Sequence, residues 1–141
     1  MRVLIVKRAP LGDVVRATAL LAPLRARWPG ASFAWVAGPK ALHLLEGLGV
    51  DALTLEEAAA RLPAAGFELV LSLEEDAACA ALAARCAGGE LVGVVADGGT
   101  LGYTASSEPY YGMSLLRPAS AGGKAAADAR KAANRESWAR L

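Results

Sequence analysis

Short apolar runs and amphipathic stretches alternate along the first two thirds of the chain. Continuous aliphatic and aromatic runs indicate buried strands, and they occupy residues 3–6, 32–37, 50–55, 67–73 and 91–95. The stretches between them have helical periodicity, at 13–28, 38–48, 56–62 and 75–87. Strands that alternate with helices in this way predict an α/β fold, in which a parallel sheet is built from right-handed βαβ units and carries helices on both faces.

The first helical stretch has a well-defined apolar stripe. At 100° per residue its apolar positions fall within an arc of about 120°, and they are Val14, Ala17, Leu20, Leu21, Leu24 and Trp28. Pro23 lies outside this stripe. Because proline has no backbone N–H to donate, we expect Pro23 to kink the helix or to loosen its last turns.

The regular alternation ends after residue 95. Residues 97–118 combine glycines, Pro109 and three tyrosines without a clear period, which predicts an irregular loop. Residues 119–123 predict a flexible link. Residues 124–141 form an Ala-, Lys- and Arg-rich helical pattern that has no C-terminal glycine and is still running at the last residue, so we expect the chain to be a fragment.

Composition excludes several classes of protein. With 141 residues, 55% hydrophobic content and a net charge of +1, the chain is a folded domain and has no bulk attraction for nucleic acid. No apolar run approaches the ~20 residues of a membrane span, and no signal peptide precedes the first strand, which predicts a cytoplasmic protein. The single histidine and two cysteines speak against a metal site. Cys79 and Cys86, roughly 10 Å apart along one helix, are expected to be core residues rather than a disulfide.

Charge is distributed unevenly along the chain. Residues 1–45 hold seven Lys and Arg side chains against Asp13 alone, a net charge of +6, whereas residues 46–97 carry −8. Positive charge that is confined to the first third of the chain predicts a local anionic ligand rather than a nucleic-acid surface.

The turn after the first strand holds the candidate chemistry, since ligands of open parallel sheets bind at the carboxyl ends of the strands. This turn lacks the G-x-G-x-x-G and P-loop patterns, which speaks against a bound dinucleotide or NTP. It places the cations of Lys7 and Arg8 at the strand end, where they either bind an anion or are simply solvated. Gly12 would let a substrate, or another part of the chain, approach closely. Arg16 follows one turn into the helix and is a weaker candidate for the same ligand.

Asp13 has two interpretations. Aspartate is a preferred N-cap, so Asp13 could accept a hydrogen bond from the first amides of the helix. Alternatively, its carboxylate is a general base held where the ligand binds. The residues of the turn leave both interpretations open.

The first thirty residues resemble the opening of the heptosyltransferases, glycosyltransferase family nine. The resemblance depends most on Lys7 after a hydrophobic strand, on Gly12-Asp13-Val14, and on the aromatic-proline pair Trp28-Pro29. Further matches extend it over most of residues 1–95, at 33–36, 50–51, 67–73 and 92–93, and residues 134–138 are similar to a segment that precedes the second domain in some members.

The resemblance implies the N-terminal half of a glycosyltransferase-B fold. Residues 1–118 would be its Rossmann-like, acceptor-side domain, and residues 119–141 a linker and helix leading toward a missing C-terminal donor domain. The family transfers a heptose from an ADP-activated donor to a lipopolysaccharide core acceptor, with inversion and without an essential metal or other cofactor. Asp13 would then deprotonate the acceptor hydroxyl, and Lys7 would orient anionic groups of a phosphorylated or lipid-linked glycan.

The same resemblance implies that this fragment alone is inactive, and that it reaches the cytoplasmic face of the inner membrane only through a lipid-linked acceptor. Two departures from the family, Ala19 for a common proline and Ser72 for a frequent acid, put the acceptor's identity in question more than the fold. A non-catalytic module that binds a phosphosugar or nucleotide remains the alternative, and a purely structural domain is the third.

Minor candidates complete the picture. Lys40 begins the second helix and could touch the ligand, although a solvated position is the simpler explanation. His43 is expected to be a partly buried structural residue. Tyr110 and Tyr111 either stack on a sugar ring, anchor the loop to the core or face the missing domain. Glycines 98, 99 and 102 are interpreted as a flexible turn.

Overall fold

A six-stranded sheet forms the centre of the molecule. The computed structural model describes residues 1–97, 99–113 and 122–136. The strands follow the order β3-β2-β1-β4-β5-β6, with β6 alone antiparallel to its neighbour. Their bounds are β1 Arg2–Val6, β2 Ser32–Val36, β3 Asp51–Leu53, β4 Phe67–Ser72, β5 Ala87–Asp97 and β6 Thr100–Tyr103. The predicted α/β fold is confirmed, and its mostly parallel sheet has the strand order of a Rossmann-like fold.

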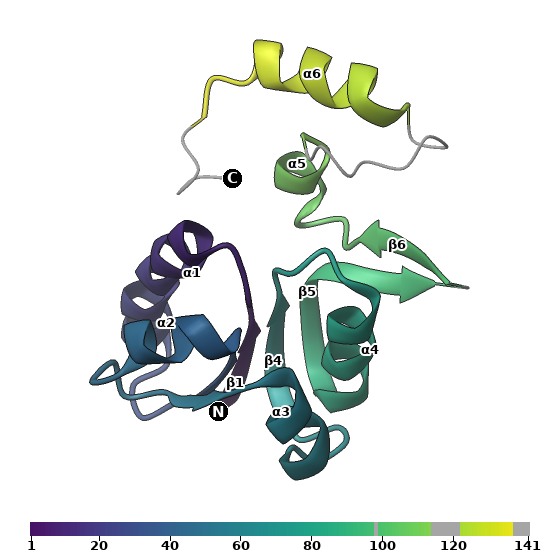
Figure 1. The fold of residues 1–141 in the computed structure, drawn as a ribbon. Helices are drawn as coiled ribbons and strands as arrows, with labels where there is room; N and C mark the ends of the chain where they lie inside the picture. The colour runs from purple at the N-terminus through teal and green to yellow at the C-terminus, as the bar shows by residue number, and fades with distance from the viewer. Residues whose placement is uncertain (98, 114–121, 137–141) are drawn as a thin grey trace.

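Helices cover both faces of the sheet (Figure 1). One face carries α1 (Leu11–Ala17), α2 (Leu21–Arg27) and the 3-10 helix η2 (Pro39–Leu45), whose apolar side chains pack on Val3 and Ile5 of β1. The other face carries α3 (Leu55–Arg61) and α4 (Ala77–Cys86), which pack on Leu4 and Val6. These four side chains of β1 are fully buried, and only Arg2 at its start is exposed. The apolar run of β1 is therefore continuous because the strand is covered on both sides.

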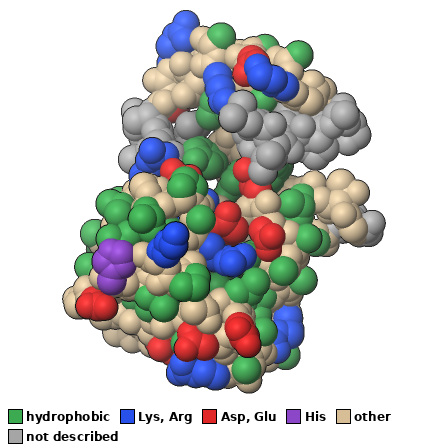
Figure 2. All heavy atoms as spheres, viewed as in Figure 1, with side chains coloured by type: hydrophobic (Ala, Val, Ile, Leu, Met, Phe, Trp, Pro, Cys, Tyr) green, Lys and Arg blue, Asp and Glu red, His purple; other side chains and the backbone are tan. Residues whose placement is uncertain are grey.

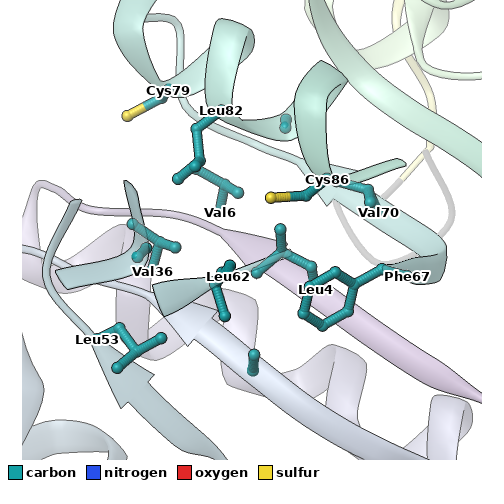
Figure 3. Close-up of a cluster of buried hydrophobic side chains, with 13 residues drawn as sticks. Leu4, Val6, Val36, Leu53, Leu62, Phe67, Val70, Cys79, Leu82 and Cys86 are labelled. Atoms are coloured by element: carbon teal, nitrogen blue, oxygen red, sulfur yellow. The ribbon is translucent and has the colours of Figure 1, made fainter. Parts of the chain in front are cut away.

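Both cysteines belong to the core on the α4 side of the sheet. Figure 3 shows Cys86 projecting from α4 toward Val6 and Leu4, and Cys79 at the margin of the same cluster, beyond Leu82. Both are free thiols and fully buried, as predicted. Burial raises the pKa of Cys79 to about 11, so this thiol is protonated and unreactive at neutral pH.

The first helix differs from its predicted form. It begins at Leu11, two residues before the predicted start, and changes to a 3-10 turn (η1) at Thr18–Leu20 before α2 begins. Pro23 explains the interruption, because it offers no N–H to the carbonyl of Ala19 and its ring crowds that carbonyl. The interruption precedes Pro23, and the last turns of the helix, in α2, are regular α-helix rather than loosened.

The third strand is shorter than predicted because a helix cap follows it immediately. The Thr54 side chain accepts a hydrogen bond from the Glu57 amide at 3.2 Å, and the Glu57 carboxylate accepts one from the Thr54 amide at 2.8 Å. This reciprocal capping box starts α3 at Leu55, which the sequence pattern had assigned to the strand. The hydrogen bonds that Thr54 donates lower the pKa of Glu57.

The prediction of an irregular loop over residues 97–118 is wrong for its described part. β5 continues to Asp97, β6 returns antiparallel to it, and a short helix, α5 (Glu108–Tyr111), follows. A tight hairpin between antiparallel strands gives no βα alternation, so the earlier pattern cannot reveal it. Residues 114–118 lie outside the described residues.

The last described helix is α6 (Gly123–Ala133). Gly122 precedes it at φ +90°, a left-handed conformation that suits glycine. Arg130 of α6 donates to both carboxylate oxygens of Glu108 on α5, at 2.5 and 2.6 Å. Of the predicted link and helix, residues 119–121 and 137–141 lie outside the described residues. Among the described helices, none is long and apolar enough to cross a membrane.

Candidate functional site

The turn after β1 lies at the carboxyl edge of the sheet, between the ends of two neighbouring strands. The Lys7 amide donates to the carbonyl of Val36 at the end of β2, and the Leu73 amide donates to the carbonyl of Val6. Residues that follow β1 therefore lie beside those that follow β4. On the face shown in Figure 2, acidic and basic side chains gather next to one another near the centre of the view.

Lys7 lies between two carboxylates. Its ammonium nitrogen is 3.8 Å from Asp13 Oδ2 and 3.7 Å from Glu74 Oε2, and its side chain is 14% exposed. Its backbone carbonyl accepts a hydrogen bond from the Trp35 indole at 3.1 Å, which ties the strand end to β2. Lys7 is thus a mostly buried cation that forms ion pairs with two acids, one on α1 and one just after β4.

Asp13 is not an N-cap, so that interpretation is wrong. Pro10 occupies the cap position of α1, and its carbonyl accepts the amides of Asp13 and Val14 at 3.0 and 3.1 Å. Asp13 is therefore already inside the first turn. Its carboxylate faces Lys7 on one side and Arg16 on the other, where Arg16 NH1 lies 3.2 Å from Oδ1. At 37% exposure this side chain remains accessible from solvent.

Glu74, just beyond β4, holds the turn in place and was missed by the sequence interpretation. Its Oε2 accepts the backbone amides of Arg8 at 2.7 Å and Ala9 at 3.0 Å, in addition to its ion pair with Lys7. The signal was present in the chain as three consecutive acids, Glu74, Glu75 and Asp76, directly after a buried strand. What was lacking was the strand order, which sets β4 beside β1.

Substitutions of Glu74 distinguish its role as hydrogen-bond acceptor for two backbone amides from the effect of its negative charge. Glu74→Ala is expected to lower the free energy of unfolding by about 1–3 kcal/mol, because two amides lose their acceptor and Lys7 loses a partner. Glu74→Gln keeps an acceptor oxygen and should recover most of that loss. Urea unfolding measures both variants, and equal losses would contradict the role of Glu74 in holding the amides.

Arg8 points toward α3 and α4, on the face of the sheet away from the Asp13 ion pairs. It lines a cleft of about 630 Å³ whose other walls come from α3, α4 and the start of η2. Its Nε is buried without a hydrogen-bond partner, and its NH1 makes only a long contact of 3.8 Å to Cys79 Sγ. Among the described residues, no carboxylate lies within the 4.0 Å of an ion pair with Arg8.

The remaining predicted ligand residues are placed differently. Gly12 is exposed, and a Cβ built on it would meet nothing within 4 Å. It therefore leaves open space beside Asp13, and no other part of the described chain approaches it closely. Lys40 is exposed at the start of η2, and no described acid forms an ion pair with it, so it is not drawn into the Asp13 cluster.

His43 is exposed, so its predicted partial burial is wrong. It lies in η2, a 3-10 helix with 3.0 residues per turn. In η2 the fully buried side chains are Ala41 and Leu45, and His43, midway between them along the chain, faces solvent.

The tyrosines anchor the segment that follows β5. Tyr111 is 5% exposed, and its ring stacks on that of Tyr103 with centroids 4.8 Å apart, while Tyr110 meets it edge-on at 5.0 Å. Burial raises the pKa of Tyr111. Tyr103 donates a hydrogen bond of 2.5 Å to Glu75, next to Glu74. Of the proposed roles for Tyr111, anchoring to the core is the one that the geometry supports.

Comparison of the chain with protein-family models, with curated proteins and with solved structures finds no match. The proposed resemblance therefore depends on the residues of the first strand, turn and helix themselves. Among the residues that the structure describes, no three His, Cys, Asp or Glu side chains are grouped to hold a metal ion.

The arrangement offers three chemical capabilities at one edge. Asp13 presents an accessible carboxylate that can accept a proton. Lys7 and Arg16 provide cations on either side of it, which can hold anionic groups of a ligand. Arg8 offers a further cation toward the separate cleft.

Proposed function

We propose that this chain is the acceptor-binding half of an inverting glycosyltransferase, with Asp13 as the general base. The observation that carries the proposal is the state of the Asp13 carboxylate. It lies at the carboxyl edge of the sheet, 37% exposed between Lys7 and Arg16, and it is not engaged in capping α1. It is therefore not committed to the first amides of its helix, which is the usual structural role of an aspartate at a helix start.

The reaction follows from this position. An acceptor hydroxyl beside Asp13 gives its proton to the carboxylate. At the same time the hydroxyl oxygen attacks the anomeric carbon of the donor sugar. The new C–O bond forms on the face opposite the leaving group, and the bond to the nucleotide diphosphate breaks with its electron pair remaining on the phosphate oxygen. The configuration at the anomeric carbon is thereby inverted.

The surrounding residues support binding of the acceptor. No other part of the described chain covers the Cβ position of Gly12, next to Asp13, so the acceptor can approach the turn from this side. Lys7 and Arg16 flank it with positive charge, which suits a glycan that carries phosphate or carboxylate groups. Glu74 keeps the turn that bears Lys7 in a single conformation, so these groups need not be ordered when the ligand arrives.

The remainder of the enzyme is inferred from the resemblance. In a glycosyltransferase-B arrangement a second Rossmann-like domain would bind the nucleotide sugar, such as an ADP-activated heptose, and face the edge that holds Asp13. A lipopolysaccharide-type glycan would be the acceptor. A protein that contains both halves should transfer the sugar without added metal.

Binding of the acceptor can be tested on the chain itself. Lys7→Ala is expected to weaken binding of a phosphorylated lipopolysaccharide-core oligosaccharide at least tenfold, because the ligand loses the cation next to Asp13. Isothermal titration calorimetry measures the affinity. Lys131→Ala, which removes an exposed lysine on α6 far along the chain, is the matched control and should bind as the unmodified chain does. Equal affinities for all three proteins would argue against this acceptor site.

A module that binds the same glycan without transferring a sugar is the second candidate. It is favoured by one observation, that the Asp13 carboxylate already forms ion pairs with Lys7 and Arg16, which gives its charge a role that needs no catalysis. Such a module would bind the oligosaccharide but give no transfer in a protein that also contains a donor-binding domain. Sugar transfer from a nucleotide donor, followed by mass spectrometry of the acceptor, separates the two candidates.

A further inference from the structure

The cleft beyond Arg8 is a second opening at the same edge of the sheet, on the face covered by α3 and α4. Its volume is about 630 Å³, which is within the usual range for small-molecule sites. Most of its wall is apolar and comes from three elements, with Pro39 at the start of η2, Leu55 and Ala59 on α3, and Ala78, Ala81 and Leu82 on α4. A wall of this kind favours a ligand with an apolar ring or chain.

Arg8 supplies the polar end of the cleft. Its Nε is buried without a hydrogen-bond partner, which is an unfavourable state for a donor. Its NH1 contacts only the weak acceptor Cys79 Sγ at 3.8 Å among the hydrogen bonds of the described residues. Arg8 stays charged and is only partly exposed, and its charge helps to lower the pKa of the nearby Asp76, but no described acid forms an ion pair with it.

Three of the polar groups around the cleft have partners within the chain, and the remaining acid of its wall, Glu56 on α3, is exposed. The Asp76 carboxylate accepts the Cys79 amide at 2.9 Å, and the Thr54 side chain accepts the Glu57 amide. Arg85 donates to the carbonyls of Ala58 and Ala59, at 3.4 and 3.1 Å. The helix ends around the cleft are therefore capped, and the charge that Arg8 carries is the feature that selects a ligand.

We propose that this cleft binds a small amphiphilic anion, with its phosphate or carboxylate group on Arg8 and its apolar ring or chain against α3 and α4. A guanidinium presents parallel donors that match such an oxyanion. The site goes beyond the proposed transferase reaction, because it uses neither Asp13 nor Lys7 and lies on the opposite face of the sheet. The cleft site does not depend on sugar transfer, so it would also be present if the chain were a non-catalytic binding module.

The ligand class is tested with 1-naphthyl phosphate, which combines both parts. Fluorescence titration is expected to show that it binds at least tenfold more tightly than 1-naphthol, which lacks the charge, or inorganic phosphate, which lacks the ring. Titration with 1-naphthoate in parallel shows whether a carboxylate replaces the phosphate. If the complete probe binds no more tightly than either part, the proposal is wrong.

Two pairs of variants locate the site. Arg8→Gln should weaken the binding of 1-naphthyl phosphate at least tenfold. Arg27 contacts the Trp28 ring outside the cleft, so Arg27→Gln should leave the affinity unchanged. Ala81→Phe fills the cleft from α4 and should also weaken binding at least tenfold. Ala84→Phe places the same ring at an exposed position of α4 that does not line the cleft and should leave binding unchanged.

The outcomes are distinct from those of the transferase proposal. Equal binding by Ala81→Phe and Ala84→Phe would overturn the cleft site while leaving the Asp13 assignment untouched. Arg8→Gln should keep the melting temperature of the unmodified chain, because the Arg8 side chain makes only one long hydrogen bond among the described residues. Should that variant fail to fold, the Ala81 and Ala84 pair decides the question by itself.

Discussion

Asp13→Asn is expected to reduce the rate of sugar transfer by about 10²- to 10⁴-fold in a protein that combines this chain with a donor-binding domain. Asparagine keeps an oxygen that can face Lys7 and Arg16, but its amide cannot accept the proton of an acceptor hydroxyl. The loss should therefore fall on kcat, with little change in the KM for the acceptor. Initial rates measured over a range of acceptor concentrations separate the two constants.

The fold of the Asp13→Asn variant should be unaffected. The Asp13–Arg16 pair is at the surface, where such pairs contribute about 0–1 kcal/mol, and the mostly buried Lys7 keeps its ion pair with Glu74 when Asp13 is replaced. Asp51→Asn is the matched control, since Asp51 is also an exposed acid paired with an arginine, Arg61, at 3.7 Å. Near-normal turnover by Asp13→Asn, with both variants folded, would eliminate Asp13 as the base.

Gly93→Ala is expected to have the largest effect on stability, with a loss of at least about 3 kcal/mol in the free energy of unfolding. Gly93 pairs with Ser72 across the β4–β5 ladder and has φ +112°, a conformation that L side chains rarely adopt. A Cβ at this position would lie 2.0 Å from the carbonyl oxygen of Ser72, so the two strands would have to separate. The Gly93 amide and carbonyl are also bonded to Thr104, at 3.0 and 2.9 Å, which resists such a shift.

Gly102→Ala provides the control in the adjacent strand. A Cβ on Gly102 meets only Val95 Cγ2, at 3.7 Å, and this glycine does not have a positive φ. Its replacement should change stability by less than about 1 kcal/mol. Chemical denaturation of both variants measures the difference, and a loss at Gly93 no larger than that at Gly102 would contradict the close approach of β4 and β5.

The strands at the centre of the sheet could be predicted because a strand that is covered on both faces has a continuous apolar run in its sequence. Val3 to Val6 form an unbroken apolar run since both faces of β1 are covered, and the same holds for much of β4. The second strand of the β5–β6 hairpin has no such apolar run. Its residues Leu101, Gly102 and Tyr103 are only partly buried, so they form no continuous apolar run, and part of their packing comes from Ala80 on α4.

The candidate site was only partly predictable for a related reason. Lys7, Gly12 and Asp13 lie within one turn, so their proximity follows from the chain itself. The partners of that turn do not, because Glu74 is 66 residues from the Arg8 amide that it binds. The start of α1 also escaped prediction, since the cap at Pro10 uses no side-chain hydrogen bond that a sequence pattern could signal.

By itself the sequence determined the α/β class, the alternation of strands and helices up to β5, the burial of Cys79 and Cys86, and the turn that carries Asp13. These properties depend on local periodicity and on residues close together in the chain. Only the tertiary structure decided that Asp13 is an accessible carboxylate rather than a cap, that Glu74 holds the turn, and that Arg8 opens onto a cleft. The roles of Glu74 and Arg8 depend on which strands are neighbours, and that is set by packing between distant segments, whereas the role of Asp13 depends on a helix start at Pro10 that no side-chain pattern signals.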